Sequence, residues 1–118
     1  LNKKYPGRFK LIYGDSKIVI PEYSHKYNEK FDAVYIDGGH EFEDALKDII
    51  NSKSLSTQET IVLVDDVVYQ DNTNLYHANK GSTRAWAQLV EEGFLKHINN
   101  YEFKSDGLHR SVVTGSYK

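Results

Sequence analysis

The sequence predicts an α/β layer fold in which a mostly parallel sheet ends in an antiparallel pair of strands. Three short apolar runs occupy residues 9–13, 33–36 and 61–64, and each is followed by an acidic or a glycine-acidic step. Such runs are typical of strands that are buried on both faces of a parallel sheet. Helical patterns separate and follow them, so the expected order is β-α-β-α-β-loop-α-β-β.

Amphipathic patterns predict three helices. Residues 41–55 place apolar side chains on one helical face and acidic ones in the first turn, where the helix dipole favours them. A second helix is expected to begin at Ser82 as its N-cap, to bury Trp86 and to stop at Gly93. A shorter helix is expected over residues 21–27, with its proline at the first position.

The C-terminal part predicts two more strands and a loop. Residues 95–103 and 108–114 are expected to form an antiparallel pair around the turn Asp106-Gly107. The polar segment 70–81 shows no periodicity and is expected to form a long loop over the C-terminal edge of the sheet. Ligands of such sheets bind beyond the carboxyl ends of the strands, where the acidic steps lie.

Length and composition exclude several classes of protein. The 118 residues suit one domain, and the formal charge of −2 gives no electrostatic basis for binding nucleic acid or an anionic membrane. The absence of cysteine excludes disulfides and thiolate metal sites. No apolar run approaches the ~18 residues of a membrane span, and no signal peptide is evident, so we expect a cytoplasmic protein.

Four motifs carry a resemblance to a known family. Residues 31–44, FDAVYIDGGHEFED, resemble a signature of class I S-adenosylmethionine-dependent methyltransferases of the O-methyltransferase kind. The turn 14–16, GDS, resembles the turn after that family's third strand. Residues 61–66, IVLVDD, resemble the end of its fifth strand, and residues 81–86, GSTRAW, resemble the helix that follows. The motifs occur in the family's order and spacing.

The resemblance implies a Rossmann-like methyltransferase sheet that is incomplete on its N-terminal side. The family's first two strands and its glycine-rich loop have no counterpart here, and the chain begins at Leu1 and contains no Met. We therefore expect residues 1–118 to be one partial domain. An upstream segment of a longer protein, or a second chain in a homo-oligomer, is expected to complete the sheet, because an open strand edge is an aggregation hazard.

The resemblance also assigns residues to the cofactor, S-adenosylmethionine. Asp15 and Ser16 are expected beside its adenine, and Asp37 on the cofactor side of the site. The alternative reading of Asp15 and Ser16 is a plain cap on the turn before a helix.

Asp37, Asp65 and Asp66 correspond to the metal ligands of the metal-dependent branch of the family. Carboxylates repel by about 4 kcal/mol per pair at 4 Å and an effective dielectric constant of 20, and a hard cation such as Mg²⁺ reverses that sign. The cation lowers the pKa of a substrate hydroxyl. The alternative is that Asp37 touches only the cofactor, while Asp65 and Asp66 cap the following loop.

His40 follows Asp37 by three residues, and the resemblance to sugar O-methyltransferases makes these two the expected catalytic residues, with His40 as general base. An imidazole with a pKa near 6.5 accepts a proton at neutral pH. The alternative is a histidine at a helix start that pairs with Glu43 or solvent. An acceptor pocket or a solvated loop is expected at four further residues: Tyr69, Tyr76, His77 and Arg84.

The function expected is methyl transfer to a small-molecule hydroxyl, on a sugar, a polyol or a phenol. An alternative hypothesis is a truncated, non-catalytic methyltransferase fold that acts in oligomerisation or protein interaction. A dehydrogenase is a third reading, which lacks support because no G-x-G-x-x-G fingerprint is present.

Overall fold

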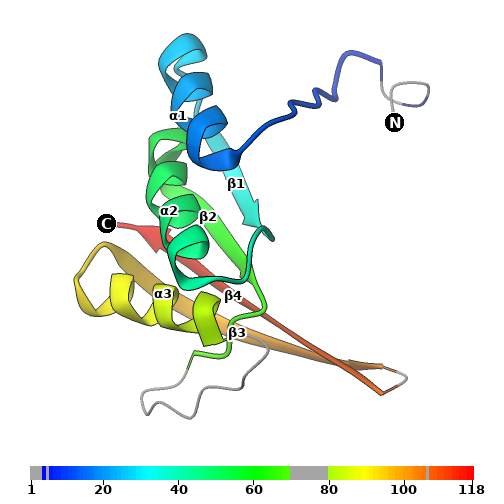
Figure 1. Ribbon diagram of the computed structural model, residues 1–118, viewed down its shortest axis with the longest axis vertical. Coiled ribbons are helices and arrows are strands. Elements are labelled where there is room, and N and C mark those ends of the chain that lie inside the picture. The colour runs from blue at the N-terminus through cyan, green and yellow to red at the C-terminus, as the bar shows by residue number, and fades with distance from the viewer. Residues whose placement is uncertain (1–3, 5, 70–79, 106) are drawn as a thin grey trace.

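The computed structural model describes residues 4, 6–69, 80–105 and 107–118 (Figure 1). Helices and strands alternate over most of this length, as the sequence predicts. In chain order the elements are α1 (Ser16–Tyr27), β1 (Phe31–Ile36), α2 (Phe42–Ser52), the short 3-10 helix η1 (Lys53–Leu55), β2 (Ser56–Asp65), α3 (Lys80–Glu91), β3 (Leu95–Ser105) and β4 (Leu108–Tyr117).

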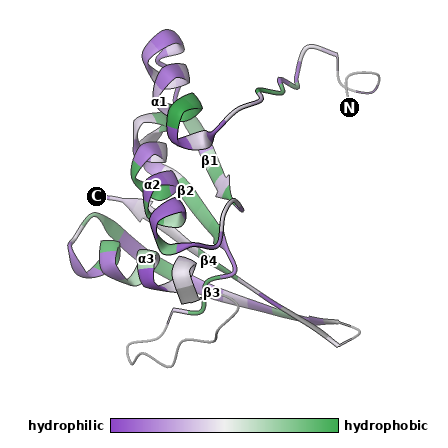
Figure 2. Ribbon diagram, viewed as in Figure 1, coloured by the Kyte–Doolittle hydropathy of each residue, from purple (hydrophilic) through white to green (hydrophobic). Residues whose placement is uncertain are grey.

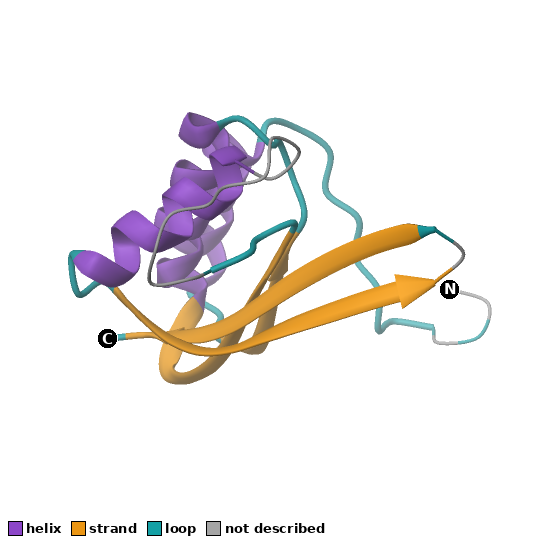
Figure 3. Ribbon diagram, turned by 90° about the horizontal axis from the view of Figure 1, so that it is seen from below, coloured by secondary structure: helices purple, strands orange, loops and turns teal. Residues whose placement is uncertain are grey.

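The four described strands form one sheet in the order β1-β2-β4-β3. β1 runs parallel to β2, and β4 is antiparallel to both β2 and β3. The predicted α/β fold and its C-terminal antiparallel pair are therefore confirmed, in a sheet that is mixed over the described residues. The described helices all lie on one face of the sheet (Figure 3).

The hydrophobic core lies between the sheet and α2 and α3. Along β2 the side chains alternate between the two faces, so Val62 and Val64 are buried under the helices while Ile61 is 49% exposed. Ile49 of α2 and Trp86 of α3 have no exposed surface in this core. The predicted core position of Trp86 is confirmed. Figure 2 shows the apolar strands behind helices that are partly hydrophilic.

The strand predicted at residues 9–13 is wrong. The structure has no strand there, and Leu11 and Tyr13 are 59% and 84% exposed. A strand needs a hydrogen-bonded neighbour, and among the described strands β1 pairs only with β2. The segment instead runs away from the sheet as a single extended trace (Figure 1). β1 is thus an edge, which agrees with a sheet incomplete on its N-terminal side.

Two helix starts differ from the prediction. α1 begins at Ser16 instead of Pro21, because Asp15 caps it by accepting a hydrogen bond from the backbone N–H of Lys17 at 3.0 Å. Pro21 is tolerated inside the helix. α3 begins at Lys80, so Ser82 lies in its first turn and is not the N-cap.

The end predicted for α3 is confirmed. Gly93 adopts a left-handed φ of 78°, and its N–H donates to the carbonyl of Val90 at 3.1 Å. The N–H of Phe94 donates to the carbonyl of Leu89 at 2.9 Å, which completes a Schellman motif. Most of the loop predicted at 70–81 lies outside the described residues, as does Asp106 of the predicted turn. No helix in the described part of the chain is long and apolar enough to cross a membrane.

Candidate active site at the carboxyl ends of two parallel strands

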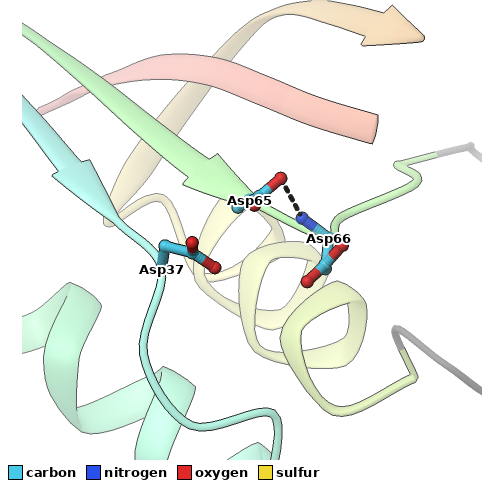
Figure 4. A group of neighbouring side chains, drawn as sticks. All are labelled: Asp37, Asp65 and Asp66. Carbon is cyan, nitrogen blue, oxygen red and sulfur yellow. Dashed lines mark hydrogen bonds between the residues drawn. The ribbon is translucent and has the colours of Figure 1, made fainter. Parts of the chain in front are cut away.

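Three predicted acidic residues meet at one edge of the sheet. β1 and β2 run parallel, so their carboxyl ends lie side by side, with Asp37 directly after β1, Asp65 at the end of β2 and Asp66 after it (Figure 4). One carboxylate oxygen of each residue lies within 4.8 Å of the others. The structure therefore brings together all three residues that the resemblance assigns to a metal.

Asp65 is the most buried of the three, with 4% of its surface exposed. Its Oδ1 accepts from the backbone N–H of Asp66 at 3.0 Å, and its Oδ2 lies 3.3 Å from Nη2 of Arg110 on β4. Desolvation and a hydrogen bond to Asp65 raise the pKa of the Tyr35 hydroxyl above its usual value. Arg110 and Tyr35 thus fix this carboxylate from the face of the sheet opposite the described helices.

Sequence reasoning missed both of these partners. The alternation of side chains along a strand gives the face on which Tyr35 lies. Its register partner on β2 is Leu63, two residues before Asp65, so Tyr35 and Asp65 share a face. Arg110 has no comparable signal. Its place follows from the pairing of Asp65 with Val112 across β2 and β4, and that register is not readable from one sequence.

Asp66 sits in a left-handed backbone conformation with φ 59°. Its Oδ2 lies 3.5 Å from Nδ1 of His40. Burial, and then the charge of Asp65, raise the pKa of the Asp66 carboxyl above its ordinary value, while His40 opposes that shift. The ionised form of Asp66 is therefore disfavoured at this position.

His40 lies on the loop between β1 and α2, and its side chain is 59% exposed. The first turn of α3 packs against the backbone of this loop. A Cβ on Gly81 would overlap the carbonyl oxygen of His40 and lie 2.7 Å from the backbone nitrogen of Phe42. The first turn of α3 therefore packs directly on this backbone, and only glycine leaves the space.

A small pocket connects the loop with both strand ends. Asp37, His40 and Asp65 line it. Ser82 of α3, which is buried with 4% of its surface exposed, lines it as well. Ser82 is thus a third residue at the site that sequence reasoning missed, since the sequence marked it only as a helix cap.

The turn that carries Asp15 and Ser16 joins the same region through α2. Asp15 caps α1, as the alternative reading expects. The hydroxyl of Ser16 donates to Oδ1 of Asp48 at 2.6 Å, and Asp48 is 6% exposed. An adenine-binding role for Asp15 and Ser16 stays a prediction.

Two of the residues expected to line an acceptor pocket are described, and each lies against a neighbouring ring. The ring of Tyr69 stacks on His97, with 4.4 Å between the centroids. The guanidinium of Arg84 lies 4.6 Å above the ring of Phe42. Tyr76 and His77 lie outside the described residues.

The acidic cluster fits a hard cation. Carboxylate oxygens are the ligands that Mg²⁺ and Ca²⁺ prefer, and two oxygens on one Ca²⁺ stand up to about 5 Å apart, twice a bond of ~2.4 Å. The observed 4.8 Å span falls within that limit, and Mg²⁺, with shorter bonds of ~2.1 Å, would need the three carboxylates to move closer together. A cation at this place would offset the burial and the charge of Asp65 that raise the pKa of Asp66. Arg110 already provides part of this compensation for Asp65.

Comparison with known proteins identifies the family. A family model described as a methyltransferase domain matches residues 1–67, more than half of the chain. The chain therefore belongs to this family of methyltransferase domains. No curated protein matches the sequence.

Two solved structures show the same fold. An O-methyltransferase from Bacillus cereus, in complex with SAH, has a TM-score of 0.62 at 16% identity, over 85% of this chain and 46% of that chain. A TDP-rhamnose 3′-O-methyltransferase of calicheamicin biosynthesis has a TM-score of 0.53 at 16% identity, over 87% of this chain and 39% of that chain. The chain thus spans less than half of the length of either structure.

Proposed function

We propose that this chain is part of an S-adenosylmethionine-dependent O-methyltransferase that acts on a small-molecule hydroxyl of a sugar, a polyol or a phenol. The observation that carries the proposal is the convergence of Asp37, Asp65, Asp66 and His40 at one sheet edge, in a chain of the methyltransferase family. The two solved O-methyltransferases of similar fold support it. In this proposal residues 1–118 are one partial domain.

We assign the roles from the family resemblance, supported by the position of His40 and the acidic side chains. Asp15, Ser16 and Asp37 bind the methyl donor, which supplies an electrophilic methyl group on a positively charged sulfur. The acceptor hydroxyl gains the methyl group as the carbon–sulfur bond breaks, and it must lose a proton. His40 takes that proton. Asp66 lies beside Nδ1 of His40, which favours a proton on that nitrogen and leaves Nε2 to act as the base.

Metal assistance is the finer part of the proposal. Asp37, Asp65 and Asp66 would hold Mg²⁺ or a similar cation, which lowers the pKa of a coordinated hydroxyl. Mg²⁺ titration by calorimetry tests this, with Asp37→Asn as the variant and Asp32→Asn as the control, because Asp32 lies at the opposite end of β1. Equal Mg²⁺ binding by Asp37→Asn and Asp32→Asn would show that the three aspartates do not hold the metal.

The role of His40 is tested in the natural full-length protein. SAH affinity is measured by calorimetry, and turnover by SAH release with a panel of sugars, polyols and phenols. His40→Ala is expected to lower kcat by about 10²-fold or more, the usual contribution of a general base, with unchanged SAH affinity. His25→Ala, on exposed α1, is the control. Normal turnover in His40→Ala would exclude this base, and no SAH binding by the wild type would overturn the function.

A second candidate function is a non-catalytic module that pairs with itself or another protein. It is favoured by the edge of β1 that pairs with no described strand, and by exposed apolar residues on the face opposite the described helices, such as Ile61 and Phe103. Light scattering with and without SAH separates the candidates. A stable oligomer that binds no SAH supports the module, and SAH binding supports the enzyme.

A further inference from the structure

We propose that Asp48 is a positioning residue that holds the turn 14–16 and the loop 37–40 in a fixed relation to each other. The inference rests on the proposed function, because both segments carry residues assigned there to the methyl donor. The sequence places Asp48 in the middle of an amphipathic helix and gives it no chemical role. Its contacts in the structure give it one.

The first contact joins α2 to the turn before α1. Asp48 is 6% exposed, and its Oδ1 accepts a hydrogen bond from the hydroxyl of Ser16 at 2.6 Å, across 32 residues of sequence. A hydrogen bond to a carboxylate is stronger than one between neutral groups, and a buried carboxylate is costly to leave without a partner. The bond therefore fixes the turn against α2.

The second contact joins the same carboxylate to the loop after β1. A Cβ on Gly38 would lie 2.8 Å from Oδ2 of Asp48, closer than real Cβ contacts allow. An alanine at position 38 would therefore have to displace the Asp48 carboxylate, which Ser16 holds in place. One buried carboxylate thus contacts both the Ser16 turn and the loop that carries Asp37 and His40.

Asp44 provides an internal comparison on the same helix face, since residues four apart lie one above the other. Its Oδ1 pairs with Nζ of Lys17 at 2.8 Å, and a Cβ on Gly39 would lie 2.9 Å from its Oδ2. This second link is exposed, with 44% and 38% of the two side chains accessible. Solvent screens such a pair, so it holds the two segments only weakly.

The binding test compares three variants of the natural full-length protein by calorimetric titration with SAH. Asp48→Ala should weaken SAH binding on the order of tenfold, because both segments of the donor site shift together. Asp48→Asn keeps an oxygen acceptor for Ser16 and should restore affinity. Asp44→Ala, which removes the exposed link, should change affinity by about twofold or less. Wild-type affinity in Asp48→Ala, or equal losses in Asp48→Ala and Asp48→Asn, would overturn the positioning role.

A stability cycle tests the Gly38 contact without a ligand. Gly38→Ala should lower Tm by about 5 °C in the wild type and by about 1 °C or less in an Asp48→Ala background, where the space is free. Equal shifts in both backgrounds would overturn the contact. If Asp48→Ala does not fold, Asp48→Ser, which also lacks the second oxygen, replaces it in both measurements. A wild type that binds no SAH would overturn the proposed function, while this cycle still decides the coupling.

Discussion

The two faces of the sheet consist of the same strands and differ in what covers them. Under α2 and α3, Val62 and Trp86 have no exposed surface. On the opposite face Ile61 and Phe103 are 49% and 58% exposed, and Ile61 lies between the buried residues Thr60 and Val62 on β2. Alternation therefore assigns a side chain to a face, and the element packed on that face decides whether the side chain leaves water.

The acidic cluster has partners on both faces of the sheet. Asp65 is fixed by Tyr35 and Arg110 from the open face, while Asp66 lies beside His40 on a loop that α3 supports. The position of the His40 loop therefore depends on packing against α3, on the face that the helices cover. The charge of Asp65 is compensated by side chains on the opposite, open face.

The largest expected difference between the faces is that between Trp86→Ala and Phe103→Ala. Trp86→Ala should lower the free energy of unfolding by about 3–5 kcal/mol, because it opens a cavity and leaves His97 without the indole donor, now 3.0 Å from its Nδ1. Phe103→Ala should cost less than about 1 kcal/mol. Urea denaturation of the natural protein measures both. A similar loss for Phe103→Ala would show that another segment or chain covers the open face.

Gly81→Ala is expected to destabilise by about 2 kcal/mol, because the added methyl group overlaps the backbone of the His40 loop. Glycine to alanine within a helix usually stabilises, so the sign of the effect is diagnostic. The same denaturation curves measure it. A stabilised variant would show that α3 does not press on the His40 loop in solution.

Val62→Ala and Ile61→Ala compare the two faces at adjacent residues of one strand. Val62→Ala should lower the free energy of unfolding by about 1.5 kcal/mol, since it empties buried space. Ile61→Ala should lower it by about 0.5 kcal/mol, because part of its side chain is already in water. Equal losses in the free energy of unfolding would show that the two faces are equally buried in solution.

Asp66→Asn is expected to give the smallest change, a gain of about 0.5 kcal/mol at neutral pH without metal, typical of partly exposed charges. The pKa of Asp66 is raised above 3.8 on folding, so its ionised form opposes folding. The penalty is absent at low pH and develops as the pH rises past that value. Asparagine also tolerates the left-handed φ of 59°.

Thermal melts between pH 4 and 7 (about the range that matters for a carboxyl group) measure this gain, which should shrink as the pH falls. Added Mg²⁺ should stabilise the wild type more than Asp66→Asn, because the variant lacks one charged ligand. A variant that gains nothing at neutral pH, or that responds to Mg²⁺ as the wild type does, would contradict the charge balance inferred for the cluster.

Most of the fold was predictable because local patterns carry it. The apolar stripe of residues 42–50 predicted α2, and the apolar run 61–64 predicted the buried part of β2. Gly93 follows the end of α3 in the left-handed conformation that glycine adopts readily. The segment 9–13 has the same kind of apolar run and forms no strand. A strand depends on a neighbour, and no local pattern says whether that neighbour is present.

By itself, the sequence determined which residues end β1 and β2, and therefore that Asp37, Asp65 and Asp66 share one edge of an α/β sheet. Only the tertiary structure decided which side chains balance and position them: Arg110 and Tyr35 at Asp65, His40 at Asp66, and Asp48 beneath the turn and the loop. The reason is physical. Strand ends follow from the period of one segment, whereas charge partners depend on register and helix packing between segments that are distant in the chain.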